Sequence, residues 1–181
     1  MKKYLLVMGL VGLMACQTSD PTQKKSTKKP SETMNIPQQG QEVGQQNKAT
    51  VRKFFTLLEQ ENITAFVDLF AENGQQINPY ASGLFPAGAK GKAALKAYWE
   101  PVPSNFAGMK FPIHEIYAME DPNMVFVRYA GQIKLKNDAG TYENEYYSTF
   151  KFDSTGKITE YVEIFNPIVA ARGFGLLDKI K

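Results

Sequence analysis

The stretch that decides the fold is ITEYVEIFNP, residues 158–167. Successive side chains of a β-strand point to opposite faces of the sheet, so Tyr161, Glu163 and Phe165 would share one face. The opposite face would then hold the even-numbered residues Ile158, Glu160, Val162 and Ile164. The pattern predicts a strand whose faces are both largely buried, with a carboxylate between two aromatic rings.

Three further β-rich runs precede this strand, over residues 109–120, 124–136 and 141–153. The segments between successive runs are DPN, NDAG and STG, which all have turn-forming composition. Strands joined by such short turns pair with their neighbours in the antiparallel sense. The C-terminal half therefore predicts an antiparallel meander.

The N-terminal half of the domain has helical spacing of its apolar residues over residues 47–62 and 63–74. A short strand over 75–80, a third helix over 92–101 and a terminal helix over 167–181 complete the expected elements. Helices followed by strands predict an α+β fold in which the helices cover one face of the sheet. We expect a strongly curved antiparallel sheet, wrapped around the N-terminal helices as a cone whose mouth suits a small apolar ligand.

The first fifteen residues are predicted to be a signal peptide. Lys2 and Lys3 precede an apolar run over residues 4–14, which is too short to span a bilayer as a mature helix. The run ends in Leu-Met-Ala-Cys at Cys16, which resembles the lipobox of bacterial lipoproteins. In those proteins the cysteine is acylated. The alternative is an ordinary signal peptide with a chance cysteine. We expect a lipid anchor such as palmitate at Cys16 in the bacterial cell envelope, and Gln17 favours the outer over the inner membrane.

Residues 16–47 are predicted to be the lipidated cysteine and a disordered tether, because Lys, Ser, Thr, Gln and Pro dominate there. Six lysines and three acidic residues precede residue 47, and this excess equals the net charge of +3. The domain over residues 48–181 is therefore neutral by count. It has no cluster of basic residues in its sequence, which argues against a nucleic-acid surface.

Several segments together resemble the SnoaL-like branch of the nuclear transport factor 2-like superfamily, closest to the phenazine biosynthesis A/B-type proteins. These segments are FVDLFAENG, residues 91–99, EDPNMVFV, YENEYYSTFKFDSTGKI and EIFNPIVAARGFG, within residues 48–177. The resemblance implies a cone-shaped α+β roll and commonly a homodimer. It also implies that Glu163 matches the pocket glutamate that acts as a general acid in the phenazine-type proteins. Their third-helix histidine falls near Tyr98 here, so that residue is absent.

Glu163 has two interpretations. In an apolar pocket its pKa rises towards the range useful for proton transfer at neutral pH. Alternatively, it pairs with a cation such as Arg128 or Arg172 and holds the sheet together. Side-chain alternation along the strand over residues 141–153 places Asn144 and Tyr146 on one face. There they either orient a ligand or form a polar network that supplies hydrogen bonds to Glu163.

The remaining pocket candidates are chosen by their expected positions at the mouth or floor of the cone. His114 is the only histidine, and its strand parity leaves its orientation open. With one His and one Cys, a metal site of the usual zinc type is not expected. The loop over residues 81–91 lacks phosphate-loop spacing, so no nucleotide cofactor is expected. The other candidates are Tyr80, Tyr98, Trp99, Tyr161 and Asn166.

Two classes of function fit these residues. The first is a membrane-anchored module that binds a small apolar or amphipathic molecule, or forms a homodimer. The second is a cofactor-independent isomerase, cyclase or dehydratase in which Glu163 is the general acid or base and Asn144 or a tyrosine hydrogen-bonds a developing oxyanion. The sequence favours the first class, because it lacks the third-helix histidine.

Overall fold

The structure, a computed structural model, describes residues 38–81, 83–137 and 139–179. The predicted signal peptide, Cys16 and the tether as far as residue 37 lie outside the described residues. Within the described ranges, no helix has both the length and the apolar character that a bilayer span requires.

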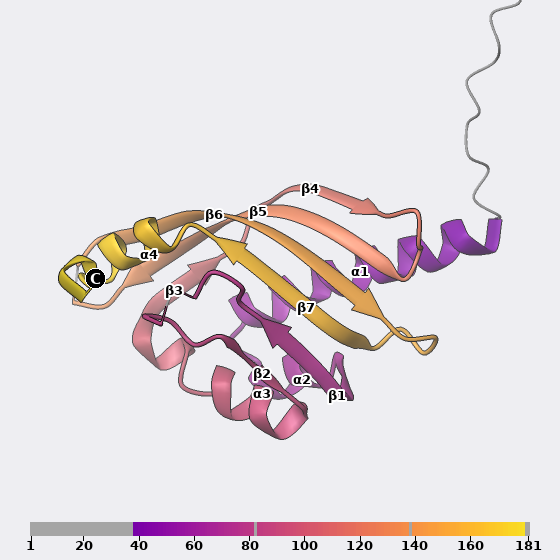
Figure 1. The fold of residues 1–181 in the computed structure, drawn as a ribbon, viewed down its shortest axis with the longest axis horizontal. Coiled ribbons are helices and arrows are strands. Elements are labelled where there is room, and N and C mark those ends of the chain that lie inside the picture. The colour runs from indigo at the N-terminus through magenta and orange to yellow at the C-terminus, as the bar shows by residue number, and fades with distance from the viewer. Residues whose placement is uncertain (1–37, 82, 138, 180–181) are drawn as a thin grey trace, which may run out of the picture. The chain divides into compact units, whose positions relative to one another are not determined.

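The core of the domain is a bent seven-stranded sheet (Figure 1). The predicted meander is confirmed, because the strands β4 to β7 pair antiparallel with their successors. One pair was not predicted: β1 runs parallel to β7, so the sheet is mixed. The strands are β1 (Phe70–Ile77), β2 (Gly88–Lys90), β3 (Phe106–Lys110), β4 (Ile113–Ala118), β5 (Met124–Leu135), β6 (Thr141–Phe152) and β7 (Ile158–Phe165).

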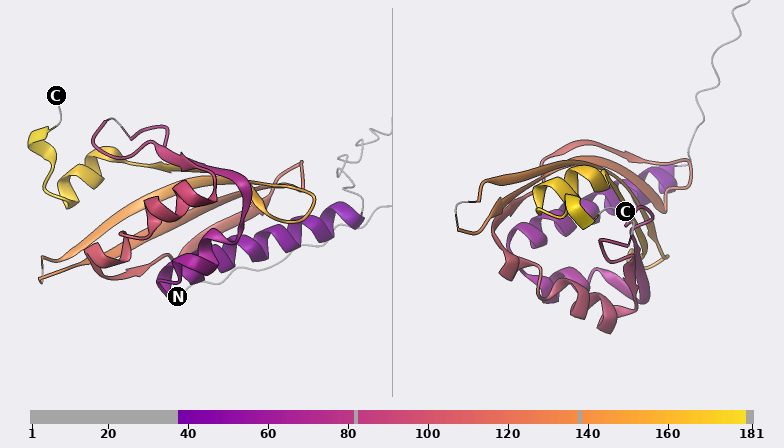
Figure 2. Two further views of the ribbon diagram at one scale, coloured as in Figure 1. Left: turned by 90° about the horizontal axis from the view of Figure 1, so that it is seen from below. Right: turned by 60° about the vertical axis from the view of Figure 1, so that its left-hand side comes forward.

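The helices lie on the concave face of the sheet, as the predicted α+β roll requires (Figure 2). The element α4 lies across one end of the curled sheet, which is seen from that end in the right-hand view of Figure 2. The helices are α1 (Gln38–Glu59), α2 (Ile63–Val67), α3 (Lys92–Trp99) and α4 (Pro167–Gly173), with 3-10 turns at Pro103–Asn105 and Leu177–Lys179.

Two predicted helix boundaries are wrong. Helix α1 begins at Gln38, so the last residues of the predicted tether are helical. The second helix ends at Val67 and not near Gly74, although Asn62 caps its start by accepting a hydrogen bond from the Ala65 amide (3.1 Å). The chain leaves the helix there because Phe70 starts strand β1 opposite Ile158, where it is completely buried.

Pro112 divides the strand predicted over residues 109–120. Proline has no N–H group and cannot continue a sheet ladder. The residues before it form β3 and those after it form β4, and both strands pair with β5. The register with β5 is the same on both sides of Pro112 and shifts only between Ile113 and Glu115, which is where His114 lies.

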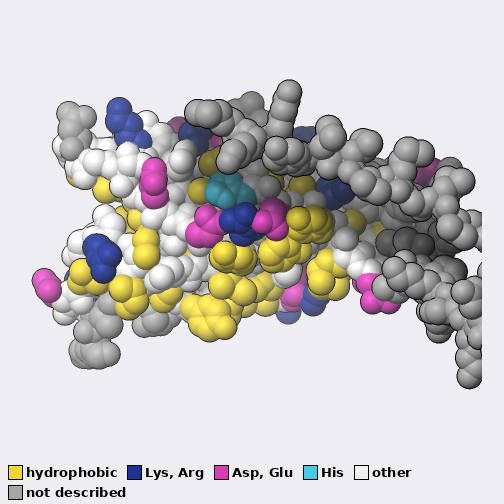
Figure 3. All heavy atoms as spheres, turned by 90° about the horizontal axis from the view of Figure 1, so that it is seen from above, with side chains coloured by type: hydrophobic (Ala, Val, Ile, Leu, Met, Phe, Trp, Pro, Cys, Tyr) yellow, Lys and Arg dark blue, Asp and Glu magenta, His cyan; other side chains and the backbone are white. Residues whose placement is uncertain are grey.

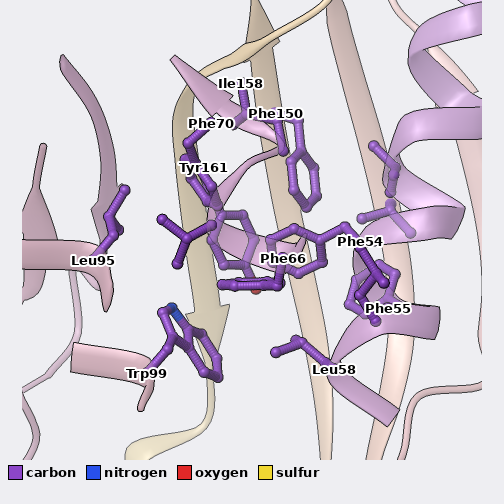
Figure 4. Packing of buried hydrophobic residues seen from close by; sticks show 14 of the residues in the cluster. Phe54, Phe55, Leu58, Phe66, Phe70, Leu95, Trp99, Phe150, Ile158 and Tyr161 are labelled. Carbon is purple, nitrogen blue, oxygen red and sulfur yellow. The ribbon is translucent and has the colours of Figure 1, made fainter. Parts of the chain in front are cut away.

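The main core is a cluster of aromatic rings between α1 and the inner face of the sheet (Figure 4). Phe54 lies at its centre, fully buried, with ring centroids 4.6 Å from Phe66, 4.9 Å from Tyr161 and 5.0 Å from Phe150. Aromatic pairs at these distances stabilise beyond simple burial, by about 0.5–1.5 kcal/mol each. The cluster fixes Tyr161, and therefore the position of β7.

The expected faces of β7 need one correction. The register between β6 and β7 shifts between the pairs Lys151–Glu160 and Phe152–Ile158, which is a β-bulge. The extra residue turns Ile158 inward, so it is fully buried on the same side as Tyr161. Val162 and Ile164 face outward and are partly exposed, so only one face of this strand is largely buried.

A second, smaller cluster lies at the other end of the inner face. Its buried members come from β3, β5, β6 and α4, and they are Met109, Ile133, Tyr142 and Ala170. Gly131 allows the Tyr146 ring to approach between the two clusters, because a Cβ atom there would lie 2.6 Å from that ring. The space between the clusters contains the candidate site.

Candidate functional site

Strand β7 carries Glu163 on the inner face of the sheet, between Tyr161 and Phe165. Tyr161 is anchored in the main core and is 1% exposed. Glu163 lies opposite Ser148 of β6 and keeps a partly accessible side chain, which lines a cavity. The alternation that predicted this orientation of Glu163 holds from Tyr161 onward, beyond the bulge.

One carboxylate oxygen of Glu163 lies against two tyrosine hydroxyls. Its Oε1 lies 2.7 Å from Tyr161 Oη and 3.1 Å from Tyr129 Oη, both within hydrogen-bond distance. The two hydroxyl oxygens are 2.8 Å apart. Since each hydroxyl has one hydrogen, the two shorter contacts form a chain in which Tyr129 donates to Tyr161 and Tyr161 donates to Glu163.

Burial dominates the electrostatics of Glu163. Loss of solvent raises the pKa of its carboxyl above the ordinary value of 4.5, and the hydrogen bonds from Tyr161 and Tyr129 lower it only in part. Burial and the Glu163 charge in turn raise the pKa values of both tyrosines well above their ordinary range. The arrangement therefore makes the protonated carboxyl more favourable than it is in an exposed glutamate, and it keeps the phenols protonated.

The predicted alternative, a structural ion pair of Glu163, is wrong. Arg128 lies on the outer face, where its guanidinium donates to Glu115 Oε1 (2.6 Å) and Glu145 Oε1 (2.8 Å). Arg172 is exposed on α4. Among the described residues, no basic side chain forms an ion pair with Glu163, and no positive charge offsets its burial.

The cavity next to Glu163 has a volume of about 170 Å³. It lies between the two core clusters, with α4 and the loop after β1 on its outer side. Most of its wall is apolar or aromatic. The lining residues are Asn78, Phe85, Pro86, Tyr98, Trp99, Val102, Phe106, Met109, Phe111, Ile133, Tyr142, Tyr146, Glu163, Phe165, Ala170 and Phe174.

A polar chain holds α3 to β1 along one side of the cavity. Trp99 Nε1 donates to Gln76 Oε1 (2.7 Å), and Gln76 Nε2 donates to Asn78 Oδ1 (3.1 Å). Asn78 Nδ2 donates to Tyr98 Oη (3.1 Å) and to the Pro86 carbonyl (2.9 Å). Burial and the Glu163 charge raise the pKa of Tyr98 to about 12, against the lowering effect of the Asn78 hydrogen bond.

Asn144 does not contact Glu163. Its Nδ2 donates to Tyr142 Oη (2.8 Å) and to the Asn166 carbonyl (3.0 Å), which ties β6 to the start of α4. The Tyr142 and Tyr146 hydroxyl oxygens are 3.0 Å apart, and the Tyr146 ring stacks on Tyr129 with centroids 4.9 Å apart. Of the two predicted roles for Asn144, the structure supports a polar network, but this network supports the cavity wall and not Glu163.

Three predicted pocket residues lie away from the cavity. His114 is on the outer face, with Nδ1 3.6 Å from Glu145 Oε1, and it lies at the register shift between Ile113 and Glu115 of β4. Tyr80 is 57% exposed and borders a shallow surface hollow that Asn144 and Asn166 also line. The Asn166 side chain caps α4 by accepting from the Ile168 and Val169 amides (3.0 and 3.2 Å).

The site combines predicted residues with others that the sequence reasoning missed. Tyr98, Trp99 and Tyr146 line the cavity with Glu163, and Tyr161 lies beneath it. Tyr129 was missed, although the apolar alternation of β5 already pointed it inward. Asn78 and Phe174 had no local signal, because loop contacts bring them to the site. In the described ranges, no group of three His, Cys, Asp or Glu side chains is arranged to hold a metal ion.

Comparison with known proteins identifies related sequences. A family model described as SnoaL-like domain matches residues 51–161. The uncharacterized protein YesE of Bacillus subtilis (strain 168) is 26% identical over 126 residues, which cover 70% of this chain and 85% of that protein.

Solved structures share the fold at lower identity. A crystal structure of a Bacillus subtilis protein has a TM-score of 0.68 at 24% identity, over 74% of this chain and 96% of that chain. A phenazine biosynthesis-related protein from Pseudomonas aeruginosa has a TM-score of 0.65 at 23% identity, over 76% of this chain and 90% of that chain. An LEH-like epoxide hydrolase from M. tuberculosis has a TM-score of 0.59 at 16% identity, over 71% of this chain and 84% of that chain. The fold family thus includes enzymes of several kinds.

The raised pKa of Glu163 predicts a specific pH dependence of stability. The folded state binds more protons than the unfolded state between pH 4.5 and the raised pKa, so the free energy of unfolding falls as pH rises through this window. Glu163→Gln removes this loss. The stability difference between the variant and the wild type should therefore shift in favour of the variant as pH rises, by at most about 1.4 kcal/mol per pH unit. Urea denaturation from pH 4 to pH 8 measures it.

Glu160→Gln is the matched control on the same strand. Lys151 lowers the pKa of Glu160 across a 2.7 Å contact, so that carboxylate stabilises the fold at neutral pH and loses its contribution as pH falls. The control should therefore show the opposite sign only at the acid end, near and below the ordinary value of 4.5, and no slope towards pH 8. Parallel pH curves for the wild type and Glu163→Gln would contradict the assignment.

Proposed function

The chain belongs to the SnoaL-like family, and from this premise we propose that its folded domain binds a small, largely apolar molecule in the cavity beside Glu163. The observation that carries the proposal is a cavity of about 170 Å³ with a mainly aromatic wall and a single carboxyl group. Ligand sites in proteins are typically apolar hollows with a few well-placed polar groups. A fully packed core would have had no such space.

A second candidate function is a cofactor-independent isomerase, cyclase or dehydratase with Glu163 as the general acid or base. The observation that favours it is the carboxyl itself. Its Oε1 lies against two tyrosine hydroxyls, and burial shifts its pKa upward, which is the direction that proton transfer near neutral pH requires. One well-placed acid or base typically contributes about 10²- to 10⁴-fold in rate.

We also propose that the chain is a lipoprotein of the bacterial cell envelope, anchored through Cys16. The support is the sequence Leu-Met-Ala-Cys after a short basic and apolar leader. Each buried CH₂ group of an acyl chain contributes about 0.8 kcal/mol, so two or more chains hold a protein firmly at a membrane surface. The cavity would then bind its ligand next to the bilayer.

A homodimer through the outer face of the sheet completes the proposal. Tyr117 and Tyr147 are 55% and 45% exposed there, beside the charged row Glu115–Arg128–Glu145 (Figure 3). A two-fold interface pairs a surface with itself. This face contains acidic, basic and apolar groups side by side, so a second copy can complement each of them.

Ligand binding should depend on the volume of the cavity. Ala170→Leu places three more heavy atoms in the wall and should abolish the saturation-transfer NMR signals of small ring compounds that bind the wild type. Val169→Leu is the matched control, because Val169 is the neighbouring α4 residue and does not line the cavity. Unchanged binding by a folded Ala170→Leu variant would rule the cavity out as the binding site.

Proton transfer by Glu163 should be visible as isotope exchange. In D₂O the wild type should exchange an acidic C–H hydrogen of a bound compound, and Glu163→Gln should slow the exchange about 10²-fold or more while the compound still binds. Proton NMR of the compound measures both. If bound compounds undergo neither exchange nor conversion, the enzyme candidate is excluded and the binding function stands.

Lipidation should depend on Cys16. In a Gram-negative host, the wild-type chain should incorporate labelled palmitate and fractionate with the outer membrane, whereas Cys16→Ser should not be labelled. Gln17→Asp should remain labelled but move towards the inner membrane. Palmitate labelling of Cys16→Ser would contradict the anchor.

The dimer should dissociate when a charge enters the outer face. Sedimentation analysis of the wild type at micromolar concentration should give a dimer, and Tyr147→Lys should give a monomer. Leu177→Lys is the control, because Leu177 is similarly exposed (41%) in the C-terminal turn. A wild-type monomer at 100 μM would contradict this interface.

A further inference from the structure

The outer side of the sheet has a hollow of its own beside Tyr80, where strand β7 passes into helix α4. Strand β6, the end of β7, the start of α4 and the turn after β1 form its wall, and its volume is about 660 Å³. Small-molecule sites typically have volumes of this order. Phe165 borders both this hollow and the cavity described above, but neither Glu163 nor any residue of α3 lines the hollow.

The hollow is the inside of a firmly held corner of the chain. Strand β7 ends at Phe165, and the Asn166 side chain then caps α4 by accepting hydrogen bonds from two of its amides (3.0 and 3.2 Å). Asn144 of β6 donates to the Asn166 carbonyl (3.0 Å), which ties the corner to the neighbouring strand. Because these bonds already hold the wall, a ligand need not order it on binding.

Exposed apolar side chains are concentrated in this hollow. Tyr80, Tyr147 and Ile164 all line it, and they are 57%, 45% and 37% exposed. Single exposed apolar residues are ordinary, whereas a group of them on one concave surface indicates a contact site. Tyr80 forms no hydrogen bond and no ring contact with any residue that the structure describes, so its ring is available to a ligand.

The charge of the hollow has one sign. Asn144 points inward, so strand alternation places its neighbours Glu143 and Glu145 together on the outer side. Glu145 is partly compensated by Arg128 at 2.8 Å, whereas Glu143 forms no ion pair within the described ranges. No Lys, Arg or His lines the hollow.

The aromatic rings and the carboxylates favour the same kind of ligand. The face of a tyrosine ring is negative and attracts a cation placed over it. A cation is also attracted by the carboxylates, whereas they repel an anion. A neutral compound gains only the apolar contacts. The ligand that uses every property of the hollow is therefore a cation with an apolar body.

We propose that this hollow is a second binding site, which takes a small organic ammonium compound. Its apolar body packs against Tyr80, Tyr147 and Ile164, and its charged nitrogen lies near Glu143. The inference does not rest on ligand binding in the cavity. Of these residues only Tyr147 was also assigned to the dimer interface, so Tyr80 and Glu143 are the positions at which to test the site.

The test is a titration of the ¹⁵N-labelled full-length protein followed by two-dimensional NMR at pH 7. The probes are 3-phenylpropylammonium, 3-phenylpropan-1-ol and 3-phenylpropanoate, which share a phenyl ring on a short chain and differ in charge. Amide signals of residues 143–147 report on the hollow, and the Trp99 indole signal reports on the cavity. At the hollow, the ammonium should bind at least about fivefold more tightly than the alcohol and about tenfold more tightly than the carboxylate.

Three variants separate charge from ring contact. Glu143→Gln should weaken ammonium binding about three- to fivefold and leave alcohol binding unchanged. Tyr80→Leu keeps an apolar side chain but loses the ring face, and it should weaken ammonium binding about two- to fivefold. Tyr80→Phe keeps the ring and should stay within about twofold of the wild type. Glu120→Gln is the matched control, because Glu120 is exposed and does not line the hollow.

The two reporters separate this inference from the proposed function. Equal affinity of the hollow for the ammonium and the alcohol, or an unchanged ammonium affinity in Glu143→Gln, would overturn the ammonium site. It would also be overturned if the ammonium shifted only the Trp99 indole signal, or if no probe shifted the signals of residues 143–147. None of these results bears on binding in the cavity, which the Ala170→Leu variant tests separately.

Discussion

The structure depends on a mismatch between the long strands of the sheet and the helix that covers them. Strands β5 and β6 are each twelve residues long and turn a mainly apolar face inward, which Asn144 and Ser148 of β6 interrupt. Helix α1 packs on the part that contains Val125, Val127 and Phe150, where the core is solid. Beyond Tyr129 the second cluster, with members from β3 and α4, covers the same strands, and there the packing leaves a cavity. The space for a ligand therefore follows from the length of the strands.

The same mismatch explains the chemistry of Glu163. The residue lies at the boundary between the solid core and the cavity, so one carboxylate oxygen reaches the buried tyrosines and the other is left without a protein partner. Its charge has no counter-ion among the described side chains, and the protein satisfies the carboxyl with neutral hydroxyls instead. Hydrogen bonds of this kind hold a group in place but offset only part of the desolvation. The result is a carboxyl with a raised pKa at the wall of an apolar cavity.

The sequence predicted those features that depend on local alternation. The period of two in β6 and β7 placed Tyr146, Tyr161 and Glu163 on the inner face, and the turn-forming segments predicted the meander. Features that depend on distant pairing were missed. Residues 70–74 have helical spacing, but the parallel pairing with β7 makes them a strand. His114 could not be oriented from parity, because the register of β4 against β5 shifts between Ile113 and Glu115. The polar chain through Asn78 forms only when a loop folds against α3.

The central claim is that the pKa of Glu163 is raised because the fold reduces its contact with solvent without supplying a positive charge. Carboxyl ¹³C NMR tests this most directly, with the Glu163 signal assigned by its disappearance in Glu163→Gln. The account predicts a titration midpoint above the ordinary glutamate value of 4.5, with a protonated chemical shift on the acidic side of that midpoint. A midpoint at or below the ordinary value would mean that the carboxyl is solvated or paired, and it would contradict the account.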